Sequence, residues 1–170
     1  MSTAESRPRS DRNVLMGVAG SGKTSVGVAL SLAAGIPYRD GDDLHPAANV
    51  AKMSRGEPLT DDDRWPWLAK VGQTLAPAPL IIGCSALKRC YRDLITAEAH
   101  APVTFIHLSG SRDLIASRMN ARKGHFMPPA LLDSQFAALE PPGPDENAIT
   151  VGIDQSLEGI VADIITALGT

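Results

Sequence analysis

A glycine-rich stretch near the start of the chain has the residue types and spacing of a phosphate-binding loop. It reads GVAGSGKT, and Gly17, Gly22, Lys23 and Thr24 fill the pattern G-x-x-x-x-G-K-[ST]. In such a loop the backbone N–H groups converge on phosphate oxygens, and the helix that follows adds its partial positive charge. We predict that nucleotide phosphates are bound by Gly17, Val18, Ala19, Gly20, Ser21, Gly22, Lys23 and Thr24.

Two residues of this loop are predicted to act on the reaction itself. Lys23 is the candidate catalytic cation, because it reaches the outer phosphates where negative charge accumulates, and the Thr24 hydroxyl can ligate Mg²⁺. The alternative is a glycine-rich turn with an exposed lysine. The flanking residues favour the phosphate loop, because an apolar run at 14–18 predicts a strand before it and residues 22–34 predict a helix after it.

A second group of chemically useful residues follows the next predicted strand, in the stretch RDGDDLHP. Asp40 and Asp42 are two residues apart at the point where the strand would deliver side chains to a ligand crevice. We predict that Asp40 faces the water shell of the metal and that Asp42 faces an acceptor hydroxyl. A solvated acidic turn is the alternative, because Asp and Gly favour turns.

The elements that position these residues alternate regularly along the chain. Apolar runs predict strands at 14–18, 36–40, 80–84, 103–108 and 148–153, and helices at 22–34, 45–54, 62–75, 88–99, 112–122, 129–139 and 157–168. Alternating strands and helices predict an α/β fold with a parallel sheet, helices on both faces and right-handed crossovers.

Composition restricts the classes of protein that this chain can be. Its 170 residues suit one domain, with 44% hydrophobic residues and a formal net charge of −3. The slight acidity disfavours nucleic acid as a partner, and no apolar run approaches the length of a membrane span. Residues 1–12 predict a flexible tail without a signal sequence, and Cys84 and Cys90 are expected to be free thiols of a cytoplasmic protein.

A phosphate loop alone does not distinguish GTPases, motor ATPases and small-molecule kinases. A GTPase of this size would have a D-x-x-G switch and an N-K-x-D base-recognition motif, and the sequence has neither. Three cations, Lys88, Arg89 and Arg92, instead follow the strand end in CSALKRCYRD. They can hold an anionic substrate at the edge of the sheet. The alternative for Arg89 is a position on the surface of the helix.

Four stretches of the sequence together resemble the P-loop gluconokinases. They are GVAGSGKT, DGDDLHPAANVAKMSRGEPLTDDDRWPWL, CSALKRCYRDLI and RMNARKGHFMP, and the resemblance extends over nearly the whole chain. It implies transfer of the γ-phosphoryl group of ATP to the 6-hydroxyl of D-gluconate, with Mg²⁺. It also implies a single kinase domain over residues 13–170 with a five-stranded parallel sheet, a substrate-side helical segment at about 45–75 and a mobile lid at about 118–129. The resemblance also suggests a homodimer. The spacing of the residues does not prove this.

The resemblance assigns the substrate carboxylate to Arg64 in TDDDRWPW, with Lys88 or Arg92 assisting. The planar fork of an arginine suits a carboxylate. In the alternative interpretation Arg64 is structural and pairs with one of the acids at 61–63. His45 lies beside the aspartate pair, where it either contacts the sugar acid or caps the next helix.

The lid is predicted from Arg118 and Arg122, which are four residues apart and share a helix face. By the resemblance, Arg118 stacks on adenine and Arg122 contacts the transferring phosphates as a catalytic residue. An exposed basic helix end is the alternative.

Two other functions remain to be distinguished from gluconate phosphorylation. The first is another small-hydroxyl kinase such as a shikimate kinase, which GEPLTDDDRWPWL disfavours. The second is a nucleotide-binding regulator that hydrolyses ATP slowly. The sequence also departs from the usual family pattern D-I-D-Q-P-L, because Gly152 and Ser156 stand at its first and fifth positions.

Overall fold

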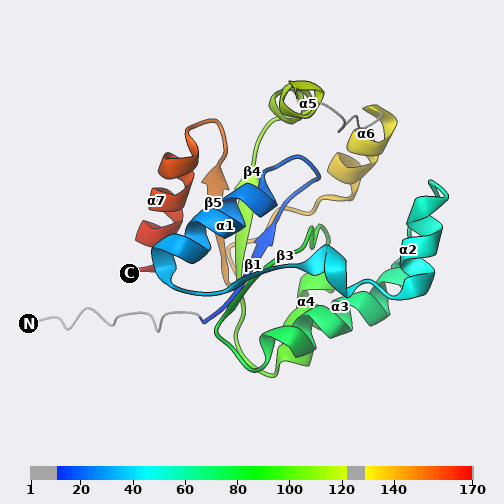
Figure 1. The fold of residues 1–170 in the computed structure, drawn as a ribbon, viewed down its shortest axis with the longest axis horizontal. Helices are drawn as coiled ribbons and strands as arrows, with labels where there is room; N and C mark the ends of the chain where they lie inside the picture. The colour runs from blue at the N-terminus through cyan, green and yellow to red at the C-terminus, as the bar shows by residue number, and fades with distance from the viewer. Residues whose placement is uncertain (1–10, 122–128, 170) are drawn as a thin grey trace, which may run out of the picture.

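The computed structural model describes residues 11–121 and 129–169, and in these ranges it contains one parallel sheet (Figure 1). The strand order is β2-β3-β1-β4-β5, and every neighbouring pair is parallel. The strands are β1 (Arg12–Met16), β2 (Tyr38–Asp40), β3 (Leu80–Gly83), β4 (Thr104–Ser109) and β5 (Ala148–Gly152). The predicted five-stranded parallel sheet is therefore confirmed.

The helices also follow the predicted order. They are α1 (Lys23–Ala34), α2 (Ala47–Ser54), α3 (Asp61–Leu75), α4 (Arg89–Ala99), α5 (Arg112–Ala121), α6 (Pro129–Ala138) and α7 (Leu157–Leu168). A short 3₁₀ helix, η1 (Gly41–Leu44), was not predicted from the sequence. None of the helices in the described ranges is long and apolar enough to cross a membrane.

Both faces of the sheet are covered, which explains the continuous apolar runs of its strands. In β1, Val14 and Met16 pack into a cluster with α3 and α4, whereas Leu15 packs into a second cluster with α1 and α7. Successive side chains of a strand point to opposite faces, so one short strand contributes to both clusters. In Figure 1 the layer of α1 and α7 is separated from the layer of α3 and α4 by the sheet.

The central position of β1 determines where the functional loops meet. Strand β1 lies between β3 and β4. Strands β2 and β3 lie on one side of it and β4 and β5 on the other, so the loop after β1 leaves the sheet at the point where the strand order reverses. Because the strands are parallel, the segments after β1, β2 and β3 emerge at the same edge. This edge holds the phosphate loop, η1 and residues 84–88.

Helices α3 and α4 approach each other closely at Gly72. A Cβ atom there would lie 2.5 Å from the backbone oxygen of Ile95 and 2.7 Å from Cβ of Glu98. At the other end of α3, Thr60 and Asp63 form a capping box that fixes the first turn. The close packing and the fixed first turn place Arg64 next to the beginning of α4.

Candidate active site

The phosphate loop has the backbone conformation that its glycines permit. Gly20 and Gly22 have φ angles of 81° and 98°, in the left-handed region that favours glycine. The Lys23 ammonium donates to the backbone oxygens of Gly17 at 2.9 Å and Val18 at 3.0 Å. Burial lowers the pKa of Lys23, and the charge of Asp42 opposes this shift. The lysine is thus held at the loop, within electrostatic reach of the aspartate pair.

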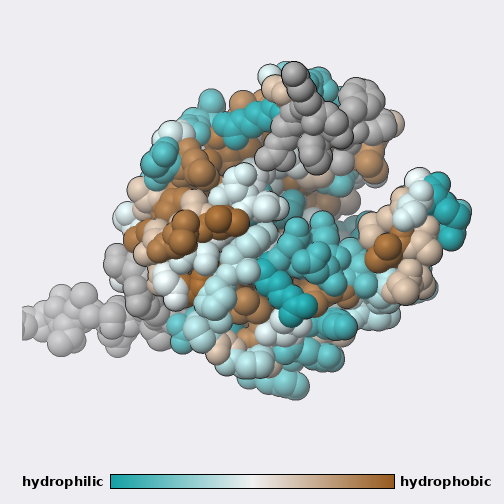
Figure 2. All heavy atoms as spheres, viewed as in Figure 1, coloured by the Kyte–Doolittle hydropathy of each residue, from teal (hydrophilic) through white to brown (hydrophobic). Residues whose placement is uncertain are grey.

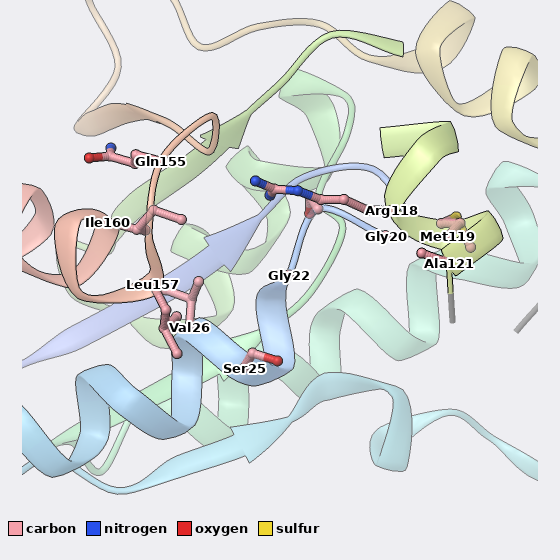
Figure 3. Close-up of a pocket in the computed structure, with 11 residues that line it drawn as sticks. Gly20, Gly22, Ser25, Val26, Arg118, Met119, Ala121, Gln155, Leu157 and Ile160 are labelled. Atoms are coloured by element: carbon pink, nitrogen blue, oxygen red, sulfur yellow. The ribbon is translucent and has the colours of Figure 1, made fainter. Parts of the chain in front are cut away.

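A cavity of about 450 Å³ lies beside the loop (Figure 3). Its walls come from the loop and α1, from α5, and from Gln155 and the first turn of α7. Figure 3 shows the Arg118 side chain extending from α5 toward the middle of the cavity, where one of its terminal nitrogens donates to the Ile153 oxygen at 2.6 Å. Gln155 and Leu157 line the opposite wall. The cavity volume suits a small organic ligand.

The aspartate pair is ordered by a local hydrogen bond. An Asp40 side-chain oxygen accepts from the backbone N–H of Asp42 at 2.9 Å and so caps η1. The Asp42 side chain itself is exposed to solvent. The surrounding protein raises the pKa of its carboxyl by desolvation, and Asp40 adds to the rise while Lys23 opposes it. The structure brings Lys23 within electrostatic reach of both Asp40 and Asp42.

The predicted metal ligands are hard oxygen donors. The Thr24 hydroxyl and the Asp40 carboxylate belong to the class of oxygen ligands that Mg²⁺ prefers. Within residues 11–121 and 129–169 no group of three or more His, Cys, Asp or Glu side chains is arranged to hold a metal alone. Mg²⁺ in kinases is typically bound through one or two protein oxygens together with substrate phosphates, and this donor set fits that pattern.

His45 is fixed next to Asp42 by an aromatic stack. Its ring lies 4.0 Å from the Trp67 ring at an interplanar angle of 16°, and its Nδ1 is 3.3 Å from the Asn49 side-chain nitrogen. Its Nε2 is 3.9 Å from an Asp42 oxygen. Burial lowers the pKa of His45, and the positive charge of Arg64 lowers it further. The N-cap of α2 is Pro46, so the alternative that His45 caps this helix is wrong.

Arg64 and Lys88 converge on the carboxylate of Asp61. The Arg64 guanidinium is 3.7 Å and the Lys88 ammonium 3.5 Å from its oxygens. Arg64 also donates to the Leu59 oxygen at 2.8 Å. The ion pair that the structural interpretation of Arg64 requires is therefore present. The same arrangement shows that the two cations can hold a carboxylate together.

Arg92 does not join these cations. Its side chain is 1% exposed, and it pairs with Glu146 through two hydrogen bonds of 2.7 and 3.1 Å. Its remaining N–H groups donate to the backbone oxygens of Ala86, Leu87 and Glu140. Every donor of the guanidinium is used inside the protein, so the structure contradicts the prediction that Arg92 binds substrate. Hydropathy patterns gave no signal of this burial, because the partner lies 54 residues further along the chain.

The surface interpretation of Arg89 is confirmed, since it forms an exposed ion pair with Asp145.

Arg122 and most of the predicted lid lie outside the described residues, as does most of the predicted tail at 1–12. Cys84 and Cys90 are free, and burial raises the pKa of Cys84 to about 12.

Sequence reasoning missed one contact of the phosphate loop. The backbone N–H of Ala19 donates to the side-chain oxygen of Gln135 in α6 at 2.6 Å. N–H groups of such a loop are the ones offered to phosphate oxygens. Gln135 is 116 residues away in sequence, and no motif marks it.

Curated proteins with similar sequences are gluconokinases. The chain is 46% identical to the thermoresistant gluconokinase of Escherichia coli strain K12 over 162 residues, which cover 91% of both chains. It is 44% identical to the gluconokinase of Gluconobacter oxydans, covering 89% of this chain and 88% of the relative. The chain belongs to the gluconokinase family. No general protein-family model matches it.

Solved structures agree with this family. A gluconokinase from Sinorhizobium meliloti superimposes with a TM-score of 0.86 at 48% identity, covering 92% of this chain and 90% of that one. A shikimate kinase from Aquifex aeolicus superimposes with a TM-score of 0.59 at 15% identity, covering 92% and 95%. The gluconokinase family therefore has the same P-loop kinase fold as shikimate kinase, as the resemblance implied.

The departure from the usual gluconokinase pattern at Ser156 has a local explanation. The Ser156 side-chain oxygen accepts from the backbone N–H of Gly159 at 3.1 Å and caps α7. A side-chain cap of this kind stabilises a helix N-terminus by about 1 kcal/mol. Gly152 has open space around it, so the structure gives no packing reason for a glycine there.

Proposed function

We propose that this protein transfers the γ-phosphoryl group of ATP to the 6-hydroxyl of D-gluconate, giving 6-phospho-D-gluconate and ADP. The observation that carries the proposal is a phosphate loop whose Lys23 interacts electrostatically with Asp42, in the same structure as a pair of cations, Arg64 and Lys88, that converge on one carboxylate. His45 links the two parts of the site, because its Nε2 is 3.9 Å from an Asp42 oxygen and the positive charge of Arg64 lowers its pKa. The gluconokinase relatives support the choice of acceptor.

The nucleotide end of the site is formed by the loop and the adjacent cavity. Backbone N–H groups of the loop bind the phosphates, and Lys23 stabilises the charge that develops during transfer. Mg²⁺ held by Thr24, with Asp40 oriented toward its waters, would supply further neutralisation of phosphate charge. We assign the adenine base of ATP to the cavity at Arg118. Arg122 is retained as a second cation that contacts the phosphates.

Asp42 is the proposed acceptor of the proton from the attacking hydroxyl. A carboxyl with a raised pKa is a better base than an ordinary aspartate, which suits it to accept a proton from a hydroxyl. Because phosphoryl transfer depends mainly on positioning and electrostatics, orientation of the hydroxyl is as important as removal of its proton. The hydrogen bond from the Asp42 backbone to Asp40 supports this orientation.

Arg64 and Lys88 are the proposed binding site for the gluconate carboxylate. We expect Arg64→Ala and Arg64→Lys to raise KM for gluconate strongly, by roughly 2–5 kcal/mol in kcat/KM if the charge pair is desolvated, and to leave KM for ATP nearly unchanged. Arg55→Ala removes an exposed arginine that forms an ion pair with its near neighbour Glu57 and is the matched control. Wild-type KM for gluconate together with reduced thermal stability in both variants would make Arg64 a scaffold residue.

A coupled assay of ADP formation tests the proposed function. The acceptor panel contains gluconate, other aldonic acids, shikimate and nucleoside monophosphates, each with ATP and Mg²⁺. We expect strong acceleration by gluconate, with 6-phosphogluconate as the product detected by mass spectrometry. Acceleration by shikimate would favour the shikimate kinase alternative, and slow ATP hydrolysis unaffected by any acceptor would favour the regulator. A cytoplasmic location and a homodimer remain proposals, and size-exclusion chromatography with light scattering tests the dimer.

A further inference from the structure

The Tyr91 side chain is the centre of the cationic cluster, although it carries no charge. Its ring is 4% exposed and lies 5.6 Å from both the Arg64 guanidinium carbon and the Lys88 ammonium. Trp65 packs edge-on against it at 5.7 Å. The Tyr91 hydroxyl donates a short hydrogen bond to Asp61. One aromatic ring therefore contacts both cations and their common carboxylate.

The charges of this cluster are not balanced. Arg64 and Lys88 bring two positive charges, and Asp61 brings one negative charge. Of the neighbouring acids, Asp63 is engaged by Lys52 at 2.6 Å and Asp62 is exposed. Among the residues that the structure describes, one positive charge is thus left for a second carboxylate at the same place. Asp61 can also compete for that charge, because it lies within reach of both cations and its side chain is 43% exposed.

We propose that Tyr91 is a positioning residue that tethers Asp61 to one side of Arg64 and Lys88, so that the acceptor's carboxylate can share these cations. The inference rests on the proposed function, because it concerns how the acid is admitted to that site. The Tyr91 hydroxyl and the Lys88 ammonium bind different oxygens of Asp61, so the tether fixes the orientation of the carboxylate as well as its position.

Three observations favour a tether over simple packing. Burial and the Asp61 carboxylate raise the pKa of Tyr91 to about 12, which keeps the phenol protonated as a donor. The Tyr91 hydrogen bond is in turn the largest cause of the lowered pKa of Asp61, ahead of Lys88 and Arg64. The Arg64 guanidinium donates to the Tyr91 hydroxyl at 3.4 Å, so this oxygen contacts both Arg64 and Asp61.

The test is a double-mutant cycle of Tyr91→Phe and Asp61→Asn in the full-length protein. Tyr91→Phe retains the buried ring and removes only the hydroxyl. We expect it to raise KM for gluconate by roughly tenfold, the scale of one hydrogen bond to a charged group, with kcat and KM for ATP nearly unchanged. In the Asp61→Asn background the same change should alter KM for gluconate less than twofold, because the competing carboxylate is gone. Asp62→Asn, which removes an exposed charge from the next residue, is the matched control.

A second measurement does not depend on turnover. The pKa of Asp61, followed by NMR through its side-chain carboxyl carbon, should rise in Tyr91→Phe and stay unchanged in Asp62→Asn. An equal effect of Tyr91→Phe on KM in both backgrounds, or an unchanged pKa of Asp61, would overturn the inference. If the wild type does not use gluconate or any other acid of the panel, the proposed function fails and the inference falls with it. If the wild type uses gluconate and the cycle shows no coupling, the inference alone fails.

Discussion

The functional side chains of this protein differ in how strongly their surroundings hold them. Asp42 is exposed and is oriented through one hydrogen bond of its own backbone. Arg92 is buried and donates five hydrogen bonds. The first arrangement suits a residue that must contact a ligand, and the second suits a residue that holds the structure around the ligand. Two predictions at the scale of the residue follow from this contrast.

Asp42→Asn should lower kcat far more than it weakens ATP binding. The amide keeps the size of the carboxylate but cannot accept the proton of the acceptor hydroxyl. Steady-state kinetics with ATP and gluconate check this expectation. The control is Asp43→Asn, which removes an exposed charge from the adjacent position. If Asp42→Asn lost ATP affinity while kcat held, the roles of Asp40 and Asp42 would have to be exchanged.

Arg92→Met should destabilise the fold by about 3–5 kcal/mol, because the Glu146 carboxylate, 9% exposed, would be left buried without its partner. Arg89→Met removes the neighbouring exposed pair with Asp145 and should cost at most about 1 kcal/mol. Urea denaturation of both variants compares the two free energies of unfolding. Equal losses would mean that the Arg92 pair contributes no more than a surface ion pair.

At the scale of elements, the site depends on the contact between α3 and α4. Helix α3 carries Arg64 and α4 carries Tyr91, and the loop before α4 ends at Lys88. Arg92 holds that loop through the oxygens of Ala86 and Leu87. Figure 1 shows the two helices side by side beneath the sheet, with α2 projecting away from them. In Figure 2 the surface is notched between α6 and α2, and hydrophilic residues gather beside the notch.

Gly72→Ala should destabilise the protein by about 1–3 kcal/mol, although alanine is the better helix former. The added methyl group would meet the Ile95 backbone oxygen at 2.5 Å, and a backbone atom in a packed helix cannot move aside cheaply. Separation of the helices should also raise KM for gluconate. Gly152→Ala, at a position with open space, is the control and should change stability by less than about 0.5 kcal/mol. The measurements are unfolding curves and gluconate kinetics of the two variants. Equal free energies of unfolding and equal KM values for gluconate would contradict close packing at Gly72.

At the scale of the whole molecule, stability should depend on pH through buried histidines. Burial lowers the pKa of His107 and of His45, and the charges of Arg92 and Arg64 respectively lower them further. A histidine with a lowered pKa binds its proton more weakly in the folded state than in the unfolded state. The stability that depends on neutral histidine is therefore complete above the unfolded pKa of about 6.5 and is lost as pH falls toward the folded value.

Two carboxylates add a second loss at lower pH. Hydrogen bonds from Lys52 and Thr60 lower the pKa of Asp63 to about 2, and Arg92 lowers the pKa of Glu146. Their contribution is present above the ordinary pKa of about 4 and is lost as pH falls below it. We expect the free energy of unfolding to fall from pH 7.5 to 5 and again below pH 4. In His107→Gln the first decrease should be smaller, and an identical pH profile in that variant would contradict the assignment.

The fold class, the phosphate loop and the aspartate pair could be predicted from the amino-acid sequence, because each depends on residues close together in the chain. The spacing of apolar residues that distinguishes strands from helices is visible within a short stretch of sequence. The glycines of the loop GVAGSGKT permit the backbone conformation that the loop requires. The run of cations after β3 also lies within a few residues, but their spacing did not reveal that Arg92 points into the protein while Lys88 reaches Asp61.

The partners of these residues became known from the folded structure, because they lie far away along the chain. Tyr91 and Asp61 are 30 residues apart, and Arg92 and Glu146 are 54 apart. Such pairs form because α3, α4 and the segment before β5 pack against one sheet and cover one another. A buried charge is stable only with a partner of opposite charge, and the fold decides which residue is close enough to be that partner. Patterns of hydropathy and charge along the chain do not give the distance in space between two residues.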